Sequence, residues 1–441
     1  MEQKPSIVEK WKPFLLGFLL GFLVFVFYLD KVHQDINFLA AKKAMVDLVP
    51  FQLLNNPSTS VIIKPLKPST SIVNPSTNVT IKPLKASTSI ADNIEKSTKK
   101  ERRKCNMFEG KWVYKAEEGP RYDSFKCPFI NEKFSCQANG RLDSKYEKWR
   151  WEARDCDIPV FNGTKMLERL RNKRMILVGD SLNRNMWESL ACLLFTSDPS
   201  YIAKADEHRR YTNTWKAKEY NFTLEFYWSA FLVDINKNHE SGKKVLILDK
   251  LSENFERCKG ADIMVFNSGH WWEPKGKSRA WEVFEYKGKL KKKMPIELAY
   301  ERGLKTWATW IKKNVDPNKT TVFFNGYSPV HRLRKHDQWC FNKTQPIRDD
   351  SFVSGFPKSM VDAVEGVIKG MSKPQVKYLN TTKLSEHRID AHPSLYITKD
   401  EKNSNSYADC SHWCLPGVPD TWNRLLYASL LFDILEKSPS N

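Results

Sequence analysis

Short apolar runs alternate with amphipathic stretches from residue 175 to the C-terminus. Six mostly apolar runs have the length and composition of buried strands: Met175–Val178, Leu224–Tyr227, Val245–Leu248, Ile263–Phe266, Thr321–Phe324 and Val376–Leu379. Apolar positions at helical spacing predict helices at Ser181–Leu194, Ile296–Val315, Lys358–Lys369 and Asp420–Leu435. Strands that alternate with helices favour an α/β fold, a three-layer, doubly wound parallel sheet with helices on both faces.

An uncharged apolar run, residues 14–29, lies near the N-terminus. With the three residues before it, the run reaches about 19 residues, close to the ~20 needed to cross a bilayer. Lysines precede it, so the positive-inside rule puts the N-terminus in the cytosol. A cleaved signal peptide is the alternative, but no small-residue cleavage pattern follows. We expect a cytosolic tail over residues 1–13 and a transmembrane signal anchor over 14–29, short enough for a thin Golgi membrane.

Residues 30–104 are rich in Pro, Ser and Thr and contain an 18-residue repeat, Asn56–Val73 followed by Asn74–Ala91. Two copies are too few for a solenoid. The composition instead predicts an extended luminal stem, open to O-glycosylation. The stem ends in the basic run Lys99–Lys104, and the whole chain has a net charge of +20. Behind a membrane anchor we interpret this run as a solvated linker, not as a nucleic-acid site.

The composition changes at Cys105. All nine cysteines and all but one of the fifteen tryptophans lie from there onward. We therefore expect a catalytic domain over residues 105–437, with a Cys-rich subdomain at 105–160 and an α/β core at 161–437. In a luminal protein the cysteines belong in disulfides. Six N-glycosylation sequons agree with that topology, at Asn78, Asn162, Asn221, Asn318, Asn342 and Asn380.

A serine stands where the first predicted strand gives way to a helix, in Gly179-Asp180-Ser181. A strand–turn–helix unit lifts such a side chain above the carboxyl edge of the sheet, where ligands bind in this fold class. The free N–H groups of the helix N-terminus favour developing negative charge there. The alternative is a plain turn in which Asp180 or Ser181 only caps the helix.

A base for this serine is available near the C-terminus, in Asp409-Cys-Ser-His412. A serine is a poor nucleophile unless a base takes its proton, and a carboxylate behind the imidazole holds its tautomer. Ser181, His412 and Asp409 therefore form a candidate catalytic triad. A structural histidine is one alternative. Another is zinc bound by Cys410, His412 and Cys414, which an oxidising lumen disfavours, so we predict no metal.

Two further stretches follow predicted strands, Phe266–Trp272 and Phe324–His331. An acyl-transfer site needs donors for the oxyanion, and Arg184, Asn267 and the backbone at Gly179 are chemically suited to that role. Candidate substrate-binding residues in the two stretches are His270, Trp271, Trp272 and His331. The paired tryptophans suit the apolar face of a sugar ring, although they fit equally a lid or the core.

Seven motifs in order resemble the plant trichome-birefringence-like family of cell-wall polysaccharide O-acetyltransferases, relatives of the GDSL/SGNH esterases. They are Cys105–Val113, Cys127–Ile130, Asn139–Ser144, Trp149–Trp151, Val178–Arg184, Asn267–Trp272 and Asp409–Asn423. The resemblance implies an SGNH-type sheet and transfer of an acetyl group to a polysaccharide hydroxyl in the Golgi lumen, through an acetyl-serine on Ser181. It also implies His412 as the base, Asp409 as its orienting acid, and Arg184 and Asn267 near the oxyanion.

The family's paired-cysteine pattern implies four disulfides and leaves Cys258 unpaired. The implied pairs are Cys105–Cys156, Cys127–Cys192, Cys136–Cys414 and Cys340–Cys410. An acetyl donor, acetyl-CoA or another acetyl carrier, is required, but no bound cofactor is expected. Expected partners are the polysaccharide acceptor, the membrane through the N-terminal helix, and a Golgi acetyl-donor transporter or glycosyltransferase.

Three alternatives stay open from the sequence. Xylan or another hemicellulose is the favoured acceptor and pectin the next. The positive charge does not decide between them, because a basic surface suits both acidic pectin and glucuronate-bearing xylan. An acetylesterase uses the same triad and differs in whether water reaches the acyl-enzyme. A non-catalytic wall-polymer binding or scaffold protein is the third, and the intact triad argues against it. The run Phe324–His331 departs from the family pattern, so the acceptor is least defined there.

Overall fold

The structure, a computed structural model of the chain, describes residues 105–197, 212–273, 279–331, 340–349, 351–352, 357–399 and 408–437. All of these residues belong to one compact unit, Leu84–Asn441. The expected anchor at 14–29 and stem at 30–104 lie outside the described residues, as does the sequon at Asn78. Within the described ranges, no helix is long and apolar enough to cross a membrane.

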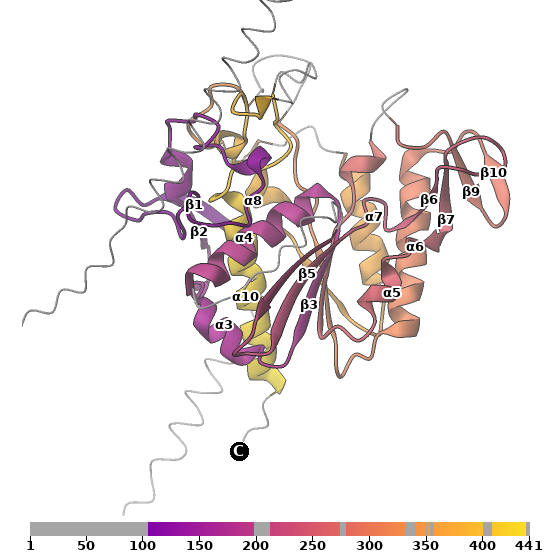
Figure 1. Cartoon of the computed structure of the whole chain (residues 1–441), viewed down its shortest axis with the longest axis horizontal. Helices are drawn as coiled ribbons and strands as arrows, with labels where there is room; N and C mark the ends of the chain where they lie inside the picture. Colours follow the sequence, from indigo (N-terminus) through magenta and orange to yellow (C-terminus); the bar gives the residue numbers. More distant parts are fainter. Residues whose placement is uncertain are drawn as a thin grey trace, which may run out of the picture. The chain divides into compact units, whose positions relative to one another are not determined.

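A six-stranded sheet forms the centre of this unit (Figure 1). Its strands lie in the order β12 (Val376–Leu379), β11 (Thr321–Asn325), β8 (Ile263–Phe266), β3 (Arg174–Gly179), β5 (Phe222–Trp228) and β4 (Thr212–Ala217). The first five are parallel, and β3 lies inside the sheet with β5 on one side and β8 on the other. In the chain β3 comes first of these strands, and the later strands add on both of its sides, which is the doubly wound topology. The α/β fold class is confirmed.

The expectation of a wholly parallel sheet is wrong at one edge. Strand β4 pairs antiparallel with β5. Its sequence is mostly polar, and only Trp215 and Ala217 of its residues are buried. An edge strand makes hydrogen bonds on one side only and needs little apolar surface, so this segment carries no run that predicts a strand.

The run Val245–Leu248 is a strand, but it does not belong to the central sheet. It lies in β7 (Val245–Leu251), part of a second sheet in the order β10 (Lys289–Lys291), β9 (Val283–Tyr286), β7, β6 (Val233–Asn236). Val245 and Ile247 pack with Val283 in a small cluster of their own. A buried apolar run indicates a strand but does not identify its partners, which explains the difference.

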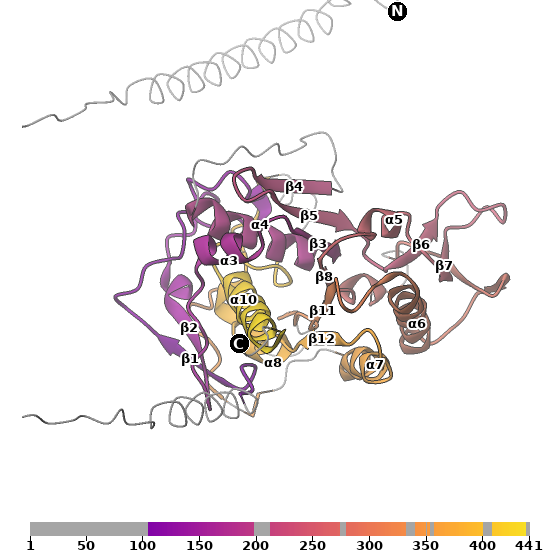
Figure 2. The ribbon, with the colours of Figure 1, turned by 90° about the horizontal axis from the view of Figure 1, so that it is seen from below.

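Helices cover both faces of the central sheet (Figure 2). Residues Met175 and Leu177 of β3 face a core shared with α4 (Ser181–Ser197) and α10 (Val418–Lys437). The alternate residues Ile176 and Val178 face a second core with α6 (Ile296–Asn314) and α7 (Lys358–Lys369). Successive side chains of a strand point to opposite faces, so a continuous apolar run is what a sheet buried on both sides requires. The three layers and the four long helices are as predicted.

Shorter elements complete the unit. They are α3 (Gly163–Arg169), α5 (Phe255–Cys258), α8 (Thr382–Glu386) and the 3-10 turns η1 (Glu132–Phe134), η2 (Lys145–Lys148), η3 (His270–Trp272) and η5 (Ile389–Ala391). The N-terminal subdomain contains β1 (Gly110–Tyr114) paired antiparallel with β2 (Trp149–Ala153). Trp112 and Trp151 lie opposite each other in this ladder with ring centroids 5.6 Å apart. Such an aromatic pair stabilises a sheet of only two strands.

Four disulfides connect the subdomain and the loops, and they are the pairs that the family resemblance implies: Cys105–Cys156, Cys127–Cys192, Cys136–Cys414 and Cys340–Cys410. Cys258 is a free, buried thiol, and burial raises its pKa to about 12. Four of the sequon asparagines are exposed and Asn380 is half-buried; the exposed ones are Asn162, Asn221, Asn318 and Asn342.

Candidate active site

Ser181 is the first residue of α4 and follows β3 after a single residue, Asp180. The buried Asp180 carboxylate accepts the Leu182 N–H at 2.9 Å and so caps the helix. Gly179 is needed for packing, because a Cβ at this position would lie 1.8 Å from Oδ1 of Asn267. The turn is therefore tight, and it presents Ser181 at the carboxyl edge of the sheet.

The candidate triad is assembled. The Nε2 atom of His412 lies 2.7 Å from Oγ of Ser181, although 231 positions separate them in the sequence. On the other side of the ring, Nδ1 lies 2.6 Å from Oδ2 of Asp409. The remaining oxygen, Oδ1, accepts the backbone N–H groups of Ser411 and His412 at 2.9 and 3.0 Å. These bonds place the Nδ1 hydrogen toward Asp409 and leave Nε2 as the acceptor for the serine proton.

The electrostatics of the pair agree with a catalytic base. Burial disfavours the His412 imidazolium, but the charge and hydrogen bond of Asp409 outweigh it, so the pKa of His412 is raised. For Asp409, burial favours the neutral acid, yet His412 and the two backbone donors hold its pKa well below its usual range. Asp409 therefore stays ionised behind the imidazole.

The loop that carries His412 is held from several sides. Its neighbours Cys410 and Cys414 are in disulfides to Cys340 and Cys136. The ring of Phe134, from the N-terminal subdomain, lies 5.2 Å from the His412 ring. The Phe134 carbonyl accepts the Leu415 N–H at 3.0 Å. The subdomain is thus one wall of the site, and the disulfides leave no thiolate pair for zinc.

The three oxyanion candidates lie at the turn but differ in what they contact. Asn267, directly after β8, donates from Nδ2 to Asp180 at 2.8 Å and accepts the Asp180 N–H at 3.1 Å. Arg184, one turn into α4, donates from Nε to Glu188 at 3.2 Å and is 26% exposed. Gly179 lies within β3 opposite Trp228, and the structure gives it a packing role. Whether any of them binds an oxyanion stays a prediction.

Two of the four candidate substrate-binding residues have side chains that are buried in the structure. Trp272 is fully buried, and its Nε1 donates to Ser268 at 3.0 Å, so it belongs to the core. His331 is 2% exposed and contacts His392. Both follow strands, but the chain turns their side chains inward, which strand position alone does not determine.

The other two remain candidates. Trp271 is 38% exposed and packs edge-on against Trp228 and Phe231, with centroids 5.5 and 6.2 Å apart. His270 is half-buried, with Nε2 2.5 Å from the Ser328 carbonyl. Burial lowers the pKa of His270, so the ring is held neutral.

Sequence reasoning missed several polar residues that support the triad. Asn183 is buried and donates to the carbonyls of Val178 and Val265 at 3.0 and 2.9 Å, which ties α4 to two strands. Asn185 exchanges two hydrogen bonds with the backbone of Trp413. The signal available in the sequence was asparagine in the interior of an apolar helix, where it is unfavourable without a specific partner.

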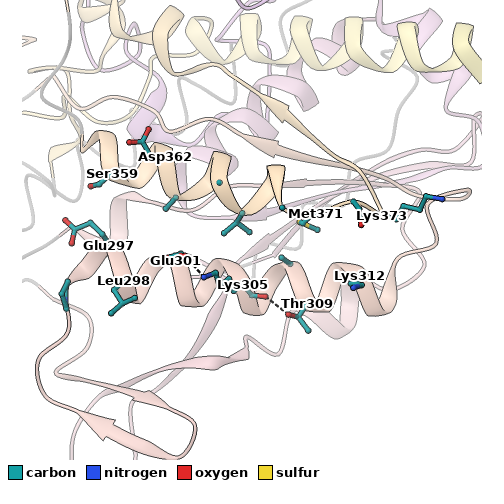
Figure 3. A pocket seen from close by; sticks show the side chains of 17 residues that line it. Glu297, Leu298, Glu301, Lys305, Thr309, Lys312, Ser359, Asp362, Met371 and Lys373 are labelled. Carbon is teal, nitrogen blue, oxygen red and sulfur yellow. Dashed lines mark hydrogen bonds and ion pairs between the residues drawn. The ribbon is translucent and has the colours of Figure 1, made fainter.

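A large groove lies away from this chemistry. It has a volume of about 1100 Å³, lies between α6 and α7, and is lined by side chains of both signs, among them Glu301, Lys305 and Asp362 (Figure 3). No triad residue lines it. Among the described residues, no group of three or more metal-ligating side chains is placed to hold an ion.

A serine, histidine and aspartate joined at the carboxyl edge of a doubly wound sheet define an acyl-esterase type of α/β protein. The comparison with known families agrees. Residues 158–429 match the PC-Esterase model, described as a GDSL/SGNH-like acyl-esterase family found in Pmr5 and Cas1p, and residues 103–157 match the PMR5 N-terminal domain. The chain belongs to the trichome birefringence-like family.

Several curated plant relatives are about two-fifths identical. Protein trichome birefringence-like 1 of Arabidopsis thaliana is 41% identical over 348 residues, which are 74% of this chain and 61% of that protein. Protein trichome birefringence-like 38 of Arabidopsis thaliana is 43% identical over 75% of this chain and 86% of its own length. Probable xylan O-acetyltransferase 10 of Oryza sativa subsp. japonica is 41% identical over 74% of this chain and 78% of its own. The chain thus spans less than two thirds of the first of these relatives.

Proposed function

We propose that this protein transfers acetyl groups to hydroxyls of a plant cell-wall polysaccharide through an acetyl-serine intermediate. The observation that carries the proposal is the hydrogen-bonded series Ser181–His412–Asp409, with heavy-atom distances of 2.7 and 2.6 Å. Those distances are within hydrogen-bond reach for proton transfer from nucleophile to base. The family match and the name of the rice relative support the same chemistry.

In the first half-reaction, Oγ of Ser181 attacks the carbonyl of the acetyl donor while Nε2 of His412 takes its proton. The donor's leaving group departs with that proton, and an ester remains on Ser181. In the second half-reaction, a sugar hydroxyl gives its proton to Nε2 and attacks the ester carbonyl. The bond to Oγ breaks, the proton returns to Ser181 and the acetylated sugar leaves. Asp409 stabilises the imidazolium in both halves.

Negative charge develops on the carbonyl oxygen in both steps. The N-terminus of α4 faces this charge favourably, since helix N–H groups there lack partners within the helix. The Nδ2 atom of Asn267 carries a second hydrogen beyond the one given to Asp180. Together with the Arg184 guanidinium, these donors make up the proposed oxyanion site.

Xylan or another hemicellulose is the proposed acceptor, and pectin is the next. The rice relative is named a probable xylan O-acetyltransferase, which supports the order. The exposed ring of Trp271 offers an apolar face to a sugar ring. We further propose a single-pass type II protein of the Golgi membrane, with the apolar run 14–29 as its anchor and acetyl-CoA or another acetyl carrier as donor.

A polysaccharide acetylesterase is the second candidate, because the matching family model is described as an acyl-esterase. One experiment decides between the two: the full-length chain in detergent is incubated with an acetyl donor and with deacetylated oligomers of xylan, mannan, xyloglucan and pectin. Mass spectrometry is expected to show acetyl addition to one polymer, absent in Ser181→Ala. Acetate release from acetylated oligomers, with no transfer to any acceptor, would establish the esterase.

A further inference from the structure

Two buried histidines form a direct pair behind the catalytic loop. His331 and His392 are 2% and 1% exposed, and Nδ1 of His331 lies 2.6 Å from Nε2 of His392. Each outer nitrogen meets a backbone carbonyl. Nε2 of His331 lies 2.7 Å from the oxygen of Glu386, and Nδ1 of His392 lies 2.6 Å from the oxygen of His412. The second carbonyl belongs to the catalytic base itself.

The number of hydrogens in this series is fixed by its ends. A carbonyl oxygen only accepts hydrogen bonds, so both outer nitrogens must carry a hydrogen. A neutral imidazole carries one N–H, and two neutral rings would then turn two bare nitrogens toward each other at 2.6 Å. A third hydrogen between the rings removes that repulsion and completes all three hydrogen bonds. The two rings together then carry one positive charge.

We propose that His331 and His392 share one proton, and that the charged pair is a positioning device that tethers the His412 backbone for catalysis. This inference rests on the proposed function for its catalytic consequence, but not for the proton itself. Loss of the proton leaves three contacts with two hydrogens. One contact must then open, and the tether to the His412 carbonyl is weakened in step with the titration of the pair.

The surroundings of the pair both oppose and favour its charge. Burial lowers the pKa of His331 to about 4 and the pKa of His392 well below its usual range. The hydrogen bond between the two rings, 2.6 Å long, is the interaction that holds the proton against this effect of burial. Favouring the charge, the His392 ring stacks on Trp413 with centroids 4.1 Å apart, as a cation does on an indole face.

Other charged groups also face the pair. The Asp409 carboxylate raises the pKa of His392, whereas His412 lowers it and His387 lowers the pKa of His331. Arg141 donates to the backbone carbonyl of His392 at 2.9 Å, and the ion-paired Arg388 and Asp390 lie on the same segment. The Asp409 carboxylate is thus a counter-charge that acts on His392, and it is also ion-paired with His412. Ionised Asp409 favours the charged form of both His412 and His392.

Nuclear magnetic resonance of the full-length chain, ¹⁵N-labelled at histidine and held in detergent, tests the shared proton directly. The chain has nine histidines, so the imidazole spectrum is small enough to assign by substitution. The expected result is a far-downfield proton shared by two rings, present at the pH of maximal activity and lost as the pH rises. Two neutral rings with one N–H each at that pH would overturn the proposal. This readout needs no acetyl transfer, so it stands or fails separately from the proposed function.

Two substitutions of His392 separate the tether from the titration. Asn places its amide nitrogen near Nδ1 of the replaced imidazole and keeps a donor to the His412 carbonyl; Gln places it near Nε2 and keeps only the contact with His331. His392→Asn is expected to retain the rate of Ser181 acetylation and lose the alkaline limb of its pH profile. His392→Gln is expected to acetylate about fivefold to tenfold more slowly at every pH, the effect of one lost buried hydrogen bond. Equal rates and equal pH profiles in the two variants would contradict the tether.

Discussion

Asn185 and Trp413 exchange two hydrogen bonds across the active site. The Trp413 N–H donates to Oδ1 of Asn185 at 2.9 Å, and Nδ2 of Asn185 donates to the Trp413 carbonyl at 3.2 Å. Asn185 lies one turn after Ser181 on α4, and Trp413 follows His412 directly. The two bonds thus connect the helix of the nucleophile to the loop of the base, independently of the triad itself.

Replacing Asn185 by Leu is expected to lower kcat more than tenfold, because the buried N–H and carbonyl of Trp413 lose their partners and the base loop moves. Each unsatisfied backbone group costs about 1–3 kcal/mol. The measurement is acetyl transfer per folded molecule, with Tm recorded in parallel. Asn423→Leu is the matched control: Asn423 is also fully buried and donates to Met186 and Ser189, but it does not contact the His412 loop. Equal losses of kcat in the two variants would count against a positioning role for Asn185.

Removing the charge behind His412 should lower activity and shift its pH dependence. In Asp409→Asn we expect kcat to fall by about 10³–10⁴, since an amide no longer fixes the tautomer or stabilises the imidazolium. The base must be neutral, and Asp409 raises its pKa, so the wild-type rate falls as the pH drops through a value above about 6.5. In the variant, burial remains as the main effect on the pKa of His412 and lowers it. The acid limb of the pH–rate profile should therefore move to lower pH.

The measurement for this prediction is kcat/KM against pH for both proteins. Asp234→Asn is the control, since Asp234 pairs with Lys250 in the second sheet and touches no triad residue. An acid limb at the same pH in wild type and Asp409→Asn would show that another group controls it.

Much of the fold follows from the sequence because local patterns carry it. Ile176 and Val178 face one core and Met175 and Leu177 the other, so β3 needed an unbroken apolar run. Pairing is a different matter. Nothing within β7 tells whether it joins the central sheet, because an apolar run indicates a strand but carries no signal for its partners.

The candidate site divides in the same way. The chemistry of Ser181, Asp409 and His412 defines their roles before any geometry is known. The place of His392 does not follow from the sequence, because its neighbours His331 and His412 come from two other loops. The burial of His331, predicted as a substrate-binding residue, does not follow from the sequence either, because the direction of its side chain depends on what packs around the loop.

Glu188 should make stability depend on pH. Burial raises the pKa of this carboxyl to about 7, even though Arg184 and the Asn131 N–H favour its charge. A carboxyl with a raised folded-state pKa contributes stability that is full below its ordinary value of 4.5 and is lost as the pH rises through about 7. The loss is on the order of 3 kcal/mol.

Glu188→Gln removes this titration and keeps one oxygen acceptor. The difference in unfolding free energy between wild type and variant should therefore change in favour of the variant between pH 4.5 and pH 8. Comparing the two proteins cancels the other carboxyls with a raised pKa, Glu147, Glu273 and Asp420, which titrate in both. Parallel stability curves across that range would mean that Glu188 is charged in the folded state.

The Cys136–Cys414 bridge should matter for activity beyond its effect on stability. It joins the N-terminal subdomain to the residue two positions after His412. Replacing both cysteines by Ser is expected to lower kcat more than tenfold in the molecules that remain folded, because the loop loses one of its fixed ends. The control, Cys105→Ser with Cys156→Ser, removes a bridge within the subdomain and should leave kcat unchanged.

Mild reduction of the wild-type chain should likewise affect activity before it affects the fold. Activity is expected to disappear before circular dichroism reports loss of the α/β core, because the Cys136–Cys414 and Cys340–Cys410 bridges hold the two ends of the His412 loop. Full activity with all nine thiols titratable would show that the bridges do not position the base.

The neighbouring tryptophans should behave oppositely when truncated. Trp271 is 38% exposed, so Trp271→Ala should lower Tm only slightly and raise KM for the acceptor about threefold to tenfold, the effect of one lost aromatic contact. Trp272 is fully buried, and Trp272→Ala should cost about 3–5 kcal/mol of stability.

Acetylation of Ser181 by the donor alone serves as the internal control for Trp271→Ala, since it does not involve the sugar. Trp271→Phe should restore most of the affinity for the acceptor. An unchanged KM for every acceptor in Trp271→Ala would place the sugar elsewhere, away from the Trp228–Trp271 edge.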